Sequence, residues 1–210
     1  MGSLPDHVKL IAVSKTRSVE EIMALYRCGH RAFGENYPQE LRHKQSQLPA
    51  DIEWHFIGHL QTNKVKYIAP FVHMIHSVDS ERLLDEINKR AAACDRTIPC
   101  LLEVHIAKEE SKHGFSPSDL MDLLNRWDHE RWDRVRASGL MGMATMTDDR
   151  TRIAQEFSSL RALYERIVQE MAGSFPHFKE LSMGMSADAD IAVRSGSTMV
   201  RMGTALFGAR

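Results

Sequence analysis

Short apolar runs alternate along this chain with longer segments in which hydrophobic residues recur every three or four positions. The short runs are rich in Val, Ile, Phe and Met and are typical of buried strands, whereas the longer segments are typical of amphipathic helices. The pattern predicts strands over residues 9–14, 31–33, 54–57, 74–78, 98–106, 135–143, 178–181 and 198–202. It predicts helices over residues 19–26, 39–47, 63–68, 81–93, 117–126, 150–171 and 187–194.

Strands that alternate with helices predict a parallel sheet covered by those helices. Eight strands of this kind can close into a (β/α)8 TIM barrel, and a chain of 210 residues lies at the lower edge of the size of that fold. We therefore expect an α/β protein made of a single TIM-barrel domain over residues 1–210.

Polar and glycine-rich segments follow most of the predicted strands, where TIM barrels carry their functional residues. These segments are Lys15 and residues 34–36, 58–59, 139–145, 182–186 and 201–204. Glycine and serine are also common in ordinary turns, so short loops alone account for much of this pattern. They account less well for a lysine, an asparagine and an arginine together.

Lys15 ends the apolar run that begins at Leu10, where an exposed charge is an odd fit. Desolvation disfavours the ammonium form of lysine, so an amine at the mouth of a buried strand is a candidate nucleophile for a Schiff base. The alternative is an ordinary lysine that points from a strand end into water.

The loops after the last two predicted strands offer groups that bind anions. Ser186 is expected to cap the helix over 187–194, so that its hydroxyl and the first free amides of that helix face an anion. Gly203 and Thr204 supply further accessible amides. With Lys15 opposite, these groups predict a pocket for a phosphorylated aldehyde. The sequence has no Walker A or GxGxxG motif to support a nucleotide site.

The composition narrows the choice of partners. The chain is 43% hydrophobic and 26% charged, with a net charge of −1 and a pI of about 6.8. It is typical of a soluble protein and predicts no electrostatic attraction to nucleic acid or anionic membrane. No apolar stretch reaches the ~20 residues of a membrane span, and the N-terminus lacks a signal-peptide pattern. We expect a monomeric cytoplasmic protein that binds a small molecule.

The cysteines and histidines predict no metal site and no disulfide framework. Cys28, Cys94 and Cys100 are odd in number and show no CxxC spacing, which indicates reduced thiols. The closest histidine pairs, His55 with His59 and His73 with His76, lack the HExxH context of a metalloprotease. We interpret these histidines as structural.

Six motifs are spread along the chain: AVSKT at 12–16, FGENY at 33–37, WHFIGHLQTNK at 54–64, HSVD at 76–79, SMGMSAD at 182–188 and VRMGTALFG at 200–208. Together they resemble the pyridoxal phosphate homeostasis protein family, over a match from about Val8 to Arg210. That family is similar in fold to the N-terminal, fold-type III barrel of alanine racemase. The resemblance implies pyridoxal 5′-phosphate (PLP) as cofactor, held as an internal aldimine on Lys15.

The resemblance also implies roles for the other motif residues. Ser186, Gly203 and Thr204 would contact the phosphate, Arg201 would partner the pyridine nitrogen, and Asn36 would lie near the cofactor. A charged guanidinium beside the ring nitrogen discourages its protonation and weakens the ring as an electron sink. Such a site binds PLP but is poorly equipped for carbanion chemistry. The alternative for Arg201 is an ordinary ion pair at the barrel end.

Two features depart from the relatives that the motifs suggest. Only seven residues precede Val8, where members of the family usually carry a helix. Alanine racemase needs a C-terminal β domain that delivers a tyrosine, whereas this chain ends four residues after Leu206.

The favoured hypothesis is a non-enzymatic protein of vitamin B6 homeostasis that holds PLP on Lys15 and buffers it or delivers it to PLP-dependent apoenzymes. The alternative is a small PLP-dependent amino-acid racemase, with Lys15 and Tyr37 as its two acid/base groups. A third hypothesis is a phosphate-binding barrel that does not use PLP.

Overall fold

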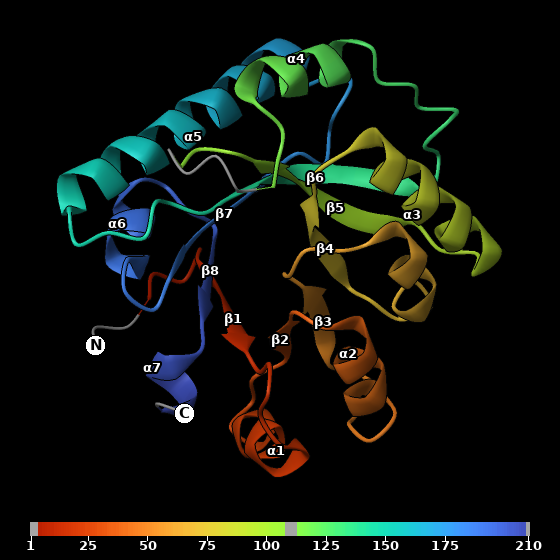
Figure 1. Ribbon diagram of the computed structural model, residues 1–210, viewed down its shortest axis with the longest axis vertical. Coiled ribbons are helices and arrows are strands. Elements are labelled where there is room, and N and C mark those ends of the chain that lie inside the picture. The colour runs from red at the N-terminus through yellow and green to blue at the C-terminus, as the bar shows by residue number, and fades with distance from the viewer. Residues whose placement is uncertain (1–3, 108–112, 209–210) are drawn as a thin grey trace.

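The computed structural model describes residues 4–107 and 113–208, and it confirms the predicted TIM barrel. Parallel strands follow one another around a closed barrel, and β1 pairs with both β2 and β8. Figure 1 shows the strands at the centre and the helices around them. The strands are β1 (Lys9–Val13), β2 (Ala32–Glu35), β3 (Glu53–Phe56), β4 (Met74–Val78), β5 (Ile98–Val104), β6 (Val135–Gly142), β7 (Glu180–Met185) and β8 (Met199–Met202).

The helices lie close to their predicted positions, with two differences. The segment after β3 is a 3₁₀ helix, and a short helix that the sequence pattern did not predict follows β8, because four residues are too few to show periodicity. The helices are α1 (Val19–Arg27), α2 (Pro38–Gln45), η1 (Thr62–Tyr67), α3 (Glu81–Ala93), α4 (Pro117–Asn125), α5 (Arg150–Met171), α6 (Ala189–Arg194) and α7 (Thr204–Phe207).

Strand β7 differs most from its prediction, because it begins at Glu180 and continues to Met185 instead of spanning 178–181. The polar Ser182 and the glycine at 184 concealed it, since neither is typical of a buried strand. Gly184 has a φ of +87°, and a Cβ there would lie 2.4 Å from the Cβ of Ala192. This glycine therefore lets α6 pack directly on β7.

The predicted cap at the start of α6 is wrong. Helix α6 begins at Ala189 with Asp188 as its N-cap residue, so Ser186 lies in the preceding turn. The Oγ of Ser186 accepts a hydrogen bond of 3.3 Å from the backbone N–H of Gly203, and Asp188 accepts one of 2.5 Å from the N–H of Met185. Ser186 thus links the loops after β7 and β8 instead of capping a helix.

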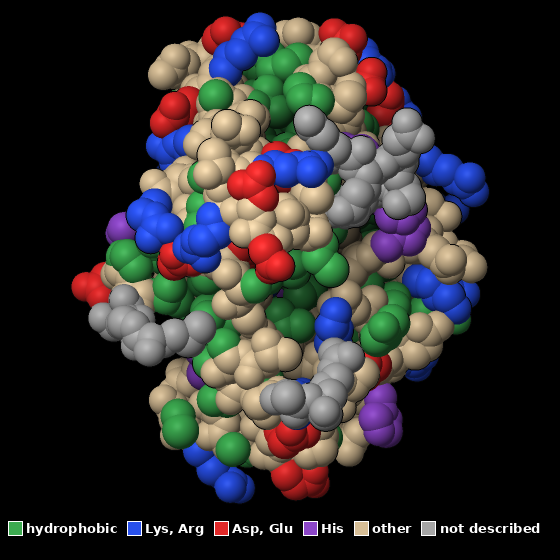
Figure 2. Space-filling model, turned by 60° about the vertical axis from the view of Figure 1, so that its left-hand side comes forward, with side chains coloured by type: hydrophobic (Ala, Val, Ile, Leu, Met, Phe, Trp, Pro, Cys, Tyr) green, Lys and Arg blue, Asp and Glu red, His purple; other side chains and the backbone are tan. Residues whose placement is uncertain are grey.

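The chain carries nearly equal numbers of basic and acidic side chains, 27 and 28. Lys, Arg, Asp and Glu side chains are interspersed on the face shown in Figure 2, as the net charge of −1 leads one to expect. In the two described stretches of chain, no helix is both long and apolar enough to cross a lipid bilayer.

Helix α1 begins with the reciprocal cap that its sequence predicts. The Oγ of Ser18 accepts from the N–H of Glu21, and the Glu21 carboxylate accepts from the N–H of Ser18 at 2.7 Å. We expect Ser18→Ala to lower the free energy of unfolding by about 1 kcal/mol, because one amide then loses its partner. Urea denaturation measures this, with the exposed Ser158→Ala of α5 as control. Equal stability of the two variants would contradict the expectation.

Candidate functional site

A pocket of about 280 Å³ opens at the carboxyl end of the barrel, between the loops that follow β1, β7 and β8. Its volume is close to the lower end of small-ligand sites, which hold roughly 300–1,000 Å³. Five of the residues that the sequence singled out line it: Lys15, Ser186, Arg201, Gly203 and Thr204. The barrel thus brings an amine, a guanidinium and a set of small polar residues together from opposite ends of the chain.

Buried polar contacts hold the backbone on both sides of Lys15. The Nζ of Lys44, on α2, donates to the carbonyl oxygen of Ser14 at 2.7 Å and to Oε1 of Glu40 at 2.6 Å. The same Glu40 oxygen accepts from the N–H of Thr16 at 2.6 Å. One lysine and one carboxylate therefore fix the residues before and after Lys15.

Glu35 completes this cluster from β2. It is fully buried, and its Oε1 accepts from Lys44 Nζ and from the Ser14 hydroxyl, each at 2.7 Å. Burial raises the pKa of Glu35, and the ammonium of Lys44 opposes that rise. Thr16 has a φ of +62°, a left-handed conformation that is unfavourable for a β-branched residue. We call Glu35, Glu40 and Lys44 the anchor cluster, since they hold this strained strand end in place.

Arg201 is the buried cation of the pocket. It is 4% exposed and donates to the carbonyl and hydroxyl oxygens of Ser182, at 3.0 and 2.6 Å, and to the carbonyl of Gly142 at 3.2 Å. Burial lowers its pKa to about 10, against the opposing charges of Glu103 and Asp188. Arg201 therefore remains charged at neutral pH, and neutral oxygens accept its hydrogen bonds.

A row of polar side chains leads from Arg201 into the barrel. The Ser182 hydroxyl lies 3.1 Å from Nδ1 of His76, and Nε2 of His76 lies 2.9 Å from Nδ1 of His55. All three residues are buried. Burial lowers the pKa of both histidines well below the usual value, so both imidazoles are neutral at pH 7.

Asn36 directly follows β2 and is not part of the pocket lining. Its side-chain Oδ1 is buried without a hydrogen-bond partner, an unfavourable state that a donor on a bound ligand would relieve. Gly58 packs directly on it, because a Cβ at position 58 would lie 2.6 Å from the Asn36 carbonyl oxygen. The unpaired amide oxygen, the amine and the buried guanidinium fit a polar ligand with an aldehyde.

A larger hollow, of about 630 Å³, lies at the opposite end of the barrel. Its lining includes Trp127 and Phe175, and the other lining residues lie before β5, around the start of β6 and before β7. Functional sites of TIM barrels form at the carboxyl ends of strands, so we assign the candidate site to the smaller pocket.

Comparison with known proteins identifies the family. The alanine racemase N-terminal domain family matches residues 2–210. A pyridoxal phosphate homeostasis protein of Aquifex aeolicus is 41% identical, over 96% of this chain and 87% of its own length. The protein of that name from Pasteurella multocida is 38% identical, over 97% of this chain and 87% of its own. The chain belongs to the pyridoxal phosphate homeostasis protein family.

A solved structure of this family carries the cofactor. PipY of Synechococcus elongatus, described with PLP bound, is 36% identical and superposes with a TM-score of 0.88 over 98% of this chain and 95% of that one. The resemblance that the six motifs indicated is thereby confirmed at the level of the family and its fold.

The anchor cluster of this family member escaped the sequence analysis. Glu35 lies inside the FGENY motif, and Glu40 and Lys44 are four residues apart on one helix, a spacing that brings side chains together. A lysine in a polar helix is normally solvated, so only the structure reveals that Lys44 is buried beneath Lys15.

Tyr37, the second acid/base group of the racemase alternative, is 55% exposed and is not part of the pocket lining. Within the described residues, the lining contains one amine, two guanidiniums and two hydroxyl groups, and no tyrosine, histidine or carboxylate. The lining therefore offers cationic and hydroxyl groups, which suit an anion or a carbonyl group.

Proposed function

We propose that this protein binds PLP through a Schiff base to Nζ of Lys15 and acts in vitamin B6 homeostasis by holding and releasing the cofactor. The single observation that carries this proposal is the pocket in which Lys15 and the buried Arg201 meet Ser186, Gly203 and Thr204. The PLP-bound structure of the relative PipY supports the identity of the ligand.

Each group of the pocket has a role in this proposal. Ser186, Gly203 and Thr204 bind the phosphate with hydroxyl and amide donors, as serine, threonine and backbone N–H groups commonly do. Arg201 can only donate hydrogen bonds, so it pairs with an unprotonated pyridine nitrogen. In this proposal, Asn36 contacts the bound cofactor from the end of β2. The anchor cluster holds the backbone of Lys15 while its amine reacts.

Bound PLP supplies an aldehyde that reacts reversibly with amines, and its ring acts as an electron sink when the pyridine nitrogen is protonated. Arg201 is charged at neutral pH and disfavours that protonation. A racemase also needs two proton-transfer groups, and the described lining offers Lys15 alone for this task. We therefore propose storage and delivery to PLP-dependent apoenzymes, without amino-acid turnover.

Borohydride reduction tests the proposal, because it converts a reversible imine into a stable amine. Purified protein loaded with PLP should yield a single reduced adduct on the peptide that contains Lys15, and Lys15→Ala should abolish it. Lys89→Ala, on the exposed face of α3, is the matched control and should keep the adduct.

Two results would overturn the proposal. The first is the absence of a reduced adduct on Lys15, or an adduct that is distributed over surface lysines. The second is interconversion of amino-acid enantiomers by the loaded protein, faster than by free PLP and lost in Tyr37→Phe.

A further inference from the structure

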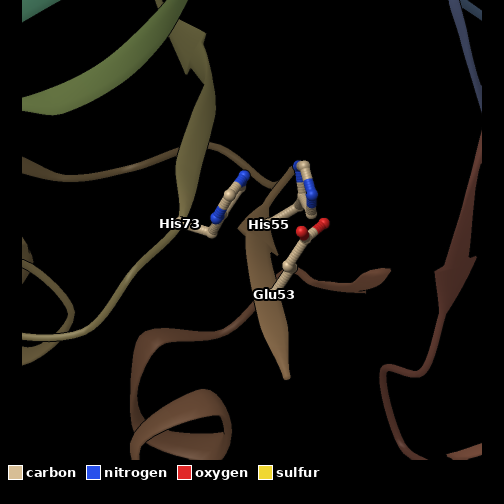
Figure 3. A group of neighbouring side chains, drawn as sticks. All are labelled: Glu53, His55 and His73. Atoms are coloured by element: carbon tan, nitrogen blue, oxygen red, sulfur yellow. The ribbon is translucent and has the colours of Figure 1, made fainter. Parts of the chain in front are cut away.

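Three potential metal ligands gather at the amino end of the barrel, opposite the PLP pocket. Glu53 and His55 lie on β3, and His73 directly precedes β4 (Figure 3). One ligand atom from each of the three lies within 4.8 Å of the ligand atoms of the other two. No local motif reveals this group, because His55 and His73 are distant in sequence and are brought together by the pairing of β3 with β4.

His55 has one ring nitrogen available for a ligand. The residue is fully buried, and its Nδ1 lies 2.9 Å from Nε2 of His76. Its Nε2 is also buried and has no hydrogen-bond partner. An unpaired polar atom in the interior is unfavourable, and such atoms in native proteins call for a ligand, a water or an ion.

The other two ligands open the group to solvent. The side chain of Glu53 is 35% exposed, and His73 is half-buried. Two imidazoles and one carboxylate form a donor set that zinc uses in proteins, with a fourth position left for water.

We propose that Glu53, His55 and His73 form a binding site for a transition-metal dication of the zinc type. His76 is the outer partner of this site, since metal-bound histidines donate their second ring N–H to a neighbouring acceptor. The site would join the starts of β3 and β4, and it shares no residue with the lining of the pocket around Lys15.

Metal binding has a consequence for the polar row that ends at Arg201. A neutral imidazole donates from one nitrogen and accepts at the other, so the row can run in either direction. Zinc at Nε2 selects the direction in which His55 donates to His76 and His76 donates to Ser182. The Ser182 oxygen then accepts from both His76 and Arg201.

Lys9 competes with the metal. Its Nζ forms an ion pair of 2.5 Å with Oε2 of Glu53, on the same side of the barrel. The lysine side chain is 38% exposed and can turn into solvent. The Lys9→Met variant should therefore bind zinc more tightly than the natural chain. Removal of a ligand should instead weaken zinc binding.

Zinc titration of the full, untagged chain tests the proposal, with a fluorescent chelator as competitor. We expect one equivalent of Zn²⁺ to bind, and we expect His73→Ala and Glu53→Gln each to weaken binding about 10- to 100-fold. Both side chains are partly exposed, so the variants should fold. Nitrogen NMR of the imidazoles should show His55 with its proton on Nδ1 after zinc is added.

Two control variants separate this site from other histidines. His43→Ala removes an exposed side chain from α2 and should not change the affinity. His59→Ala removes a histidine that lies 3.3 Å from Asp79 at the other end of the barrel, and it should also have no effect. The proposal is wrong if Zn²⁺ binding is absent or unsaturable, if His73→Ala binds as the natural chain does, or if His59→Ala causes the loss.

Discussion

Lys44→Met should lower the free energy of unfolding by about 3–5 kcal/mol, because it removes one partner of a buried ion pair. Lys44 is 4% exposed and Glu35 is fully buried, so the remaining carboxylate cannot recover its hydration. Glu35 has a raised pKa even with the ammonium present, and without it the carboxyl group should take up a proton. The loss of stability should therefore be larger at pH 8 than at pH 5.

Urea denaturation at both pH values measures this effect, and two variants calibrate it. Lys89→Met makes the same substitution on the exposed face of α3 and should be nearly neutral. The double variant Glu35→Gln with Lys44→Met removes both charges and should recover part of the stability. If Lys44→Met is as stable as Lys89→Met, the anchor cluster does not contribute the expected free energy of unfolding.

Lys44→Met should also slow imine formation by Lys15. The carbonyl of Ser14 would lose the ammonium of Lys44 and keep only the N–H of Arg17 as its donor, and Glu40 would be left alone to hold the N–H of Thr16. Absorption of the imine after PLP is added follows this step in protein that is still folded.

Glu103→Gln should stabilise the protein at pH 8 by about 3 kcal/mol more than at pH 5. Glu103 on β5 is 5% exposed, and burial, aided by the charge of Asp79, raises its pKa to about 7 against the influence of Arg201. The folded state therefore keeps a proton that the unfolded chain releases at lower pH. Its stabilising effect is complete below the unfolded pKa and is lost as the pH rises through about 7.

Glutamine cannot ionise, so the variant escapes this loss. The measurement is the difference in free energy of unfolding between Glu103→Gln and the natural chain, taken from pH 5 to 8. Glu130→Gln, at an exposed position, should give a difference that does not change with pH. A flat curve for Glu103→Gln as well would show that Glu103 does not titrate in this range.

The barrel and most of its pocket could be predicted because both follow from local patterns. Apolar runs of strand length alternate with amphipathic helices, and a parallel barrel places every strand end at one rim. Lys15, Arg201, Gly203 and Thr204 therefore had to lie near one another once eight strands were recognised. The six motifs then identified the family without any coordinates.

The polar contacts inside the barrel could not be predicted in this way. The partners of Lys44 come from the end of β1, from β2 and from α2. The row from Arg201 to His55 joins residues of four further strands, β8, β7, β4 and β3. Side chains that meet across a sheet have no fixed spacing in sequence. The predicted helix cap at Ser186 is wrong for a related reason. Its hydroxyl accepts a hydrogen bond from an amide in the loop after β8, which is distant in sequence, and Ser186 lies in the turn before the helix.

Lys15 lies in the loop after the first strand of the barrel and Arg201 lies on the last strand, and these two strands pair with each other. Contacts between residues so far apart in the chain carry a high loop-closure entropy and form late in folding. A nascent chain that has not yet made β8 therefore has the amine but not the guanidinium or the loop that follows it. The pocket around Lys15 is therefore complete only when the last strand has closed the barrel.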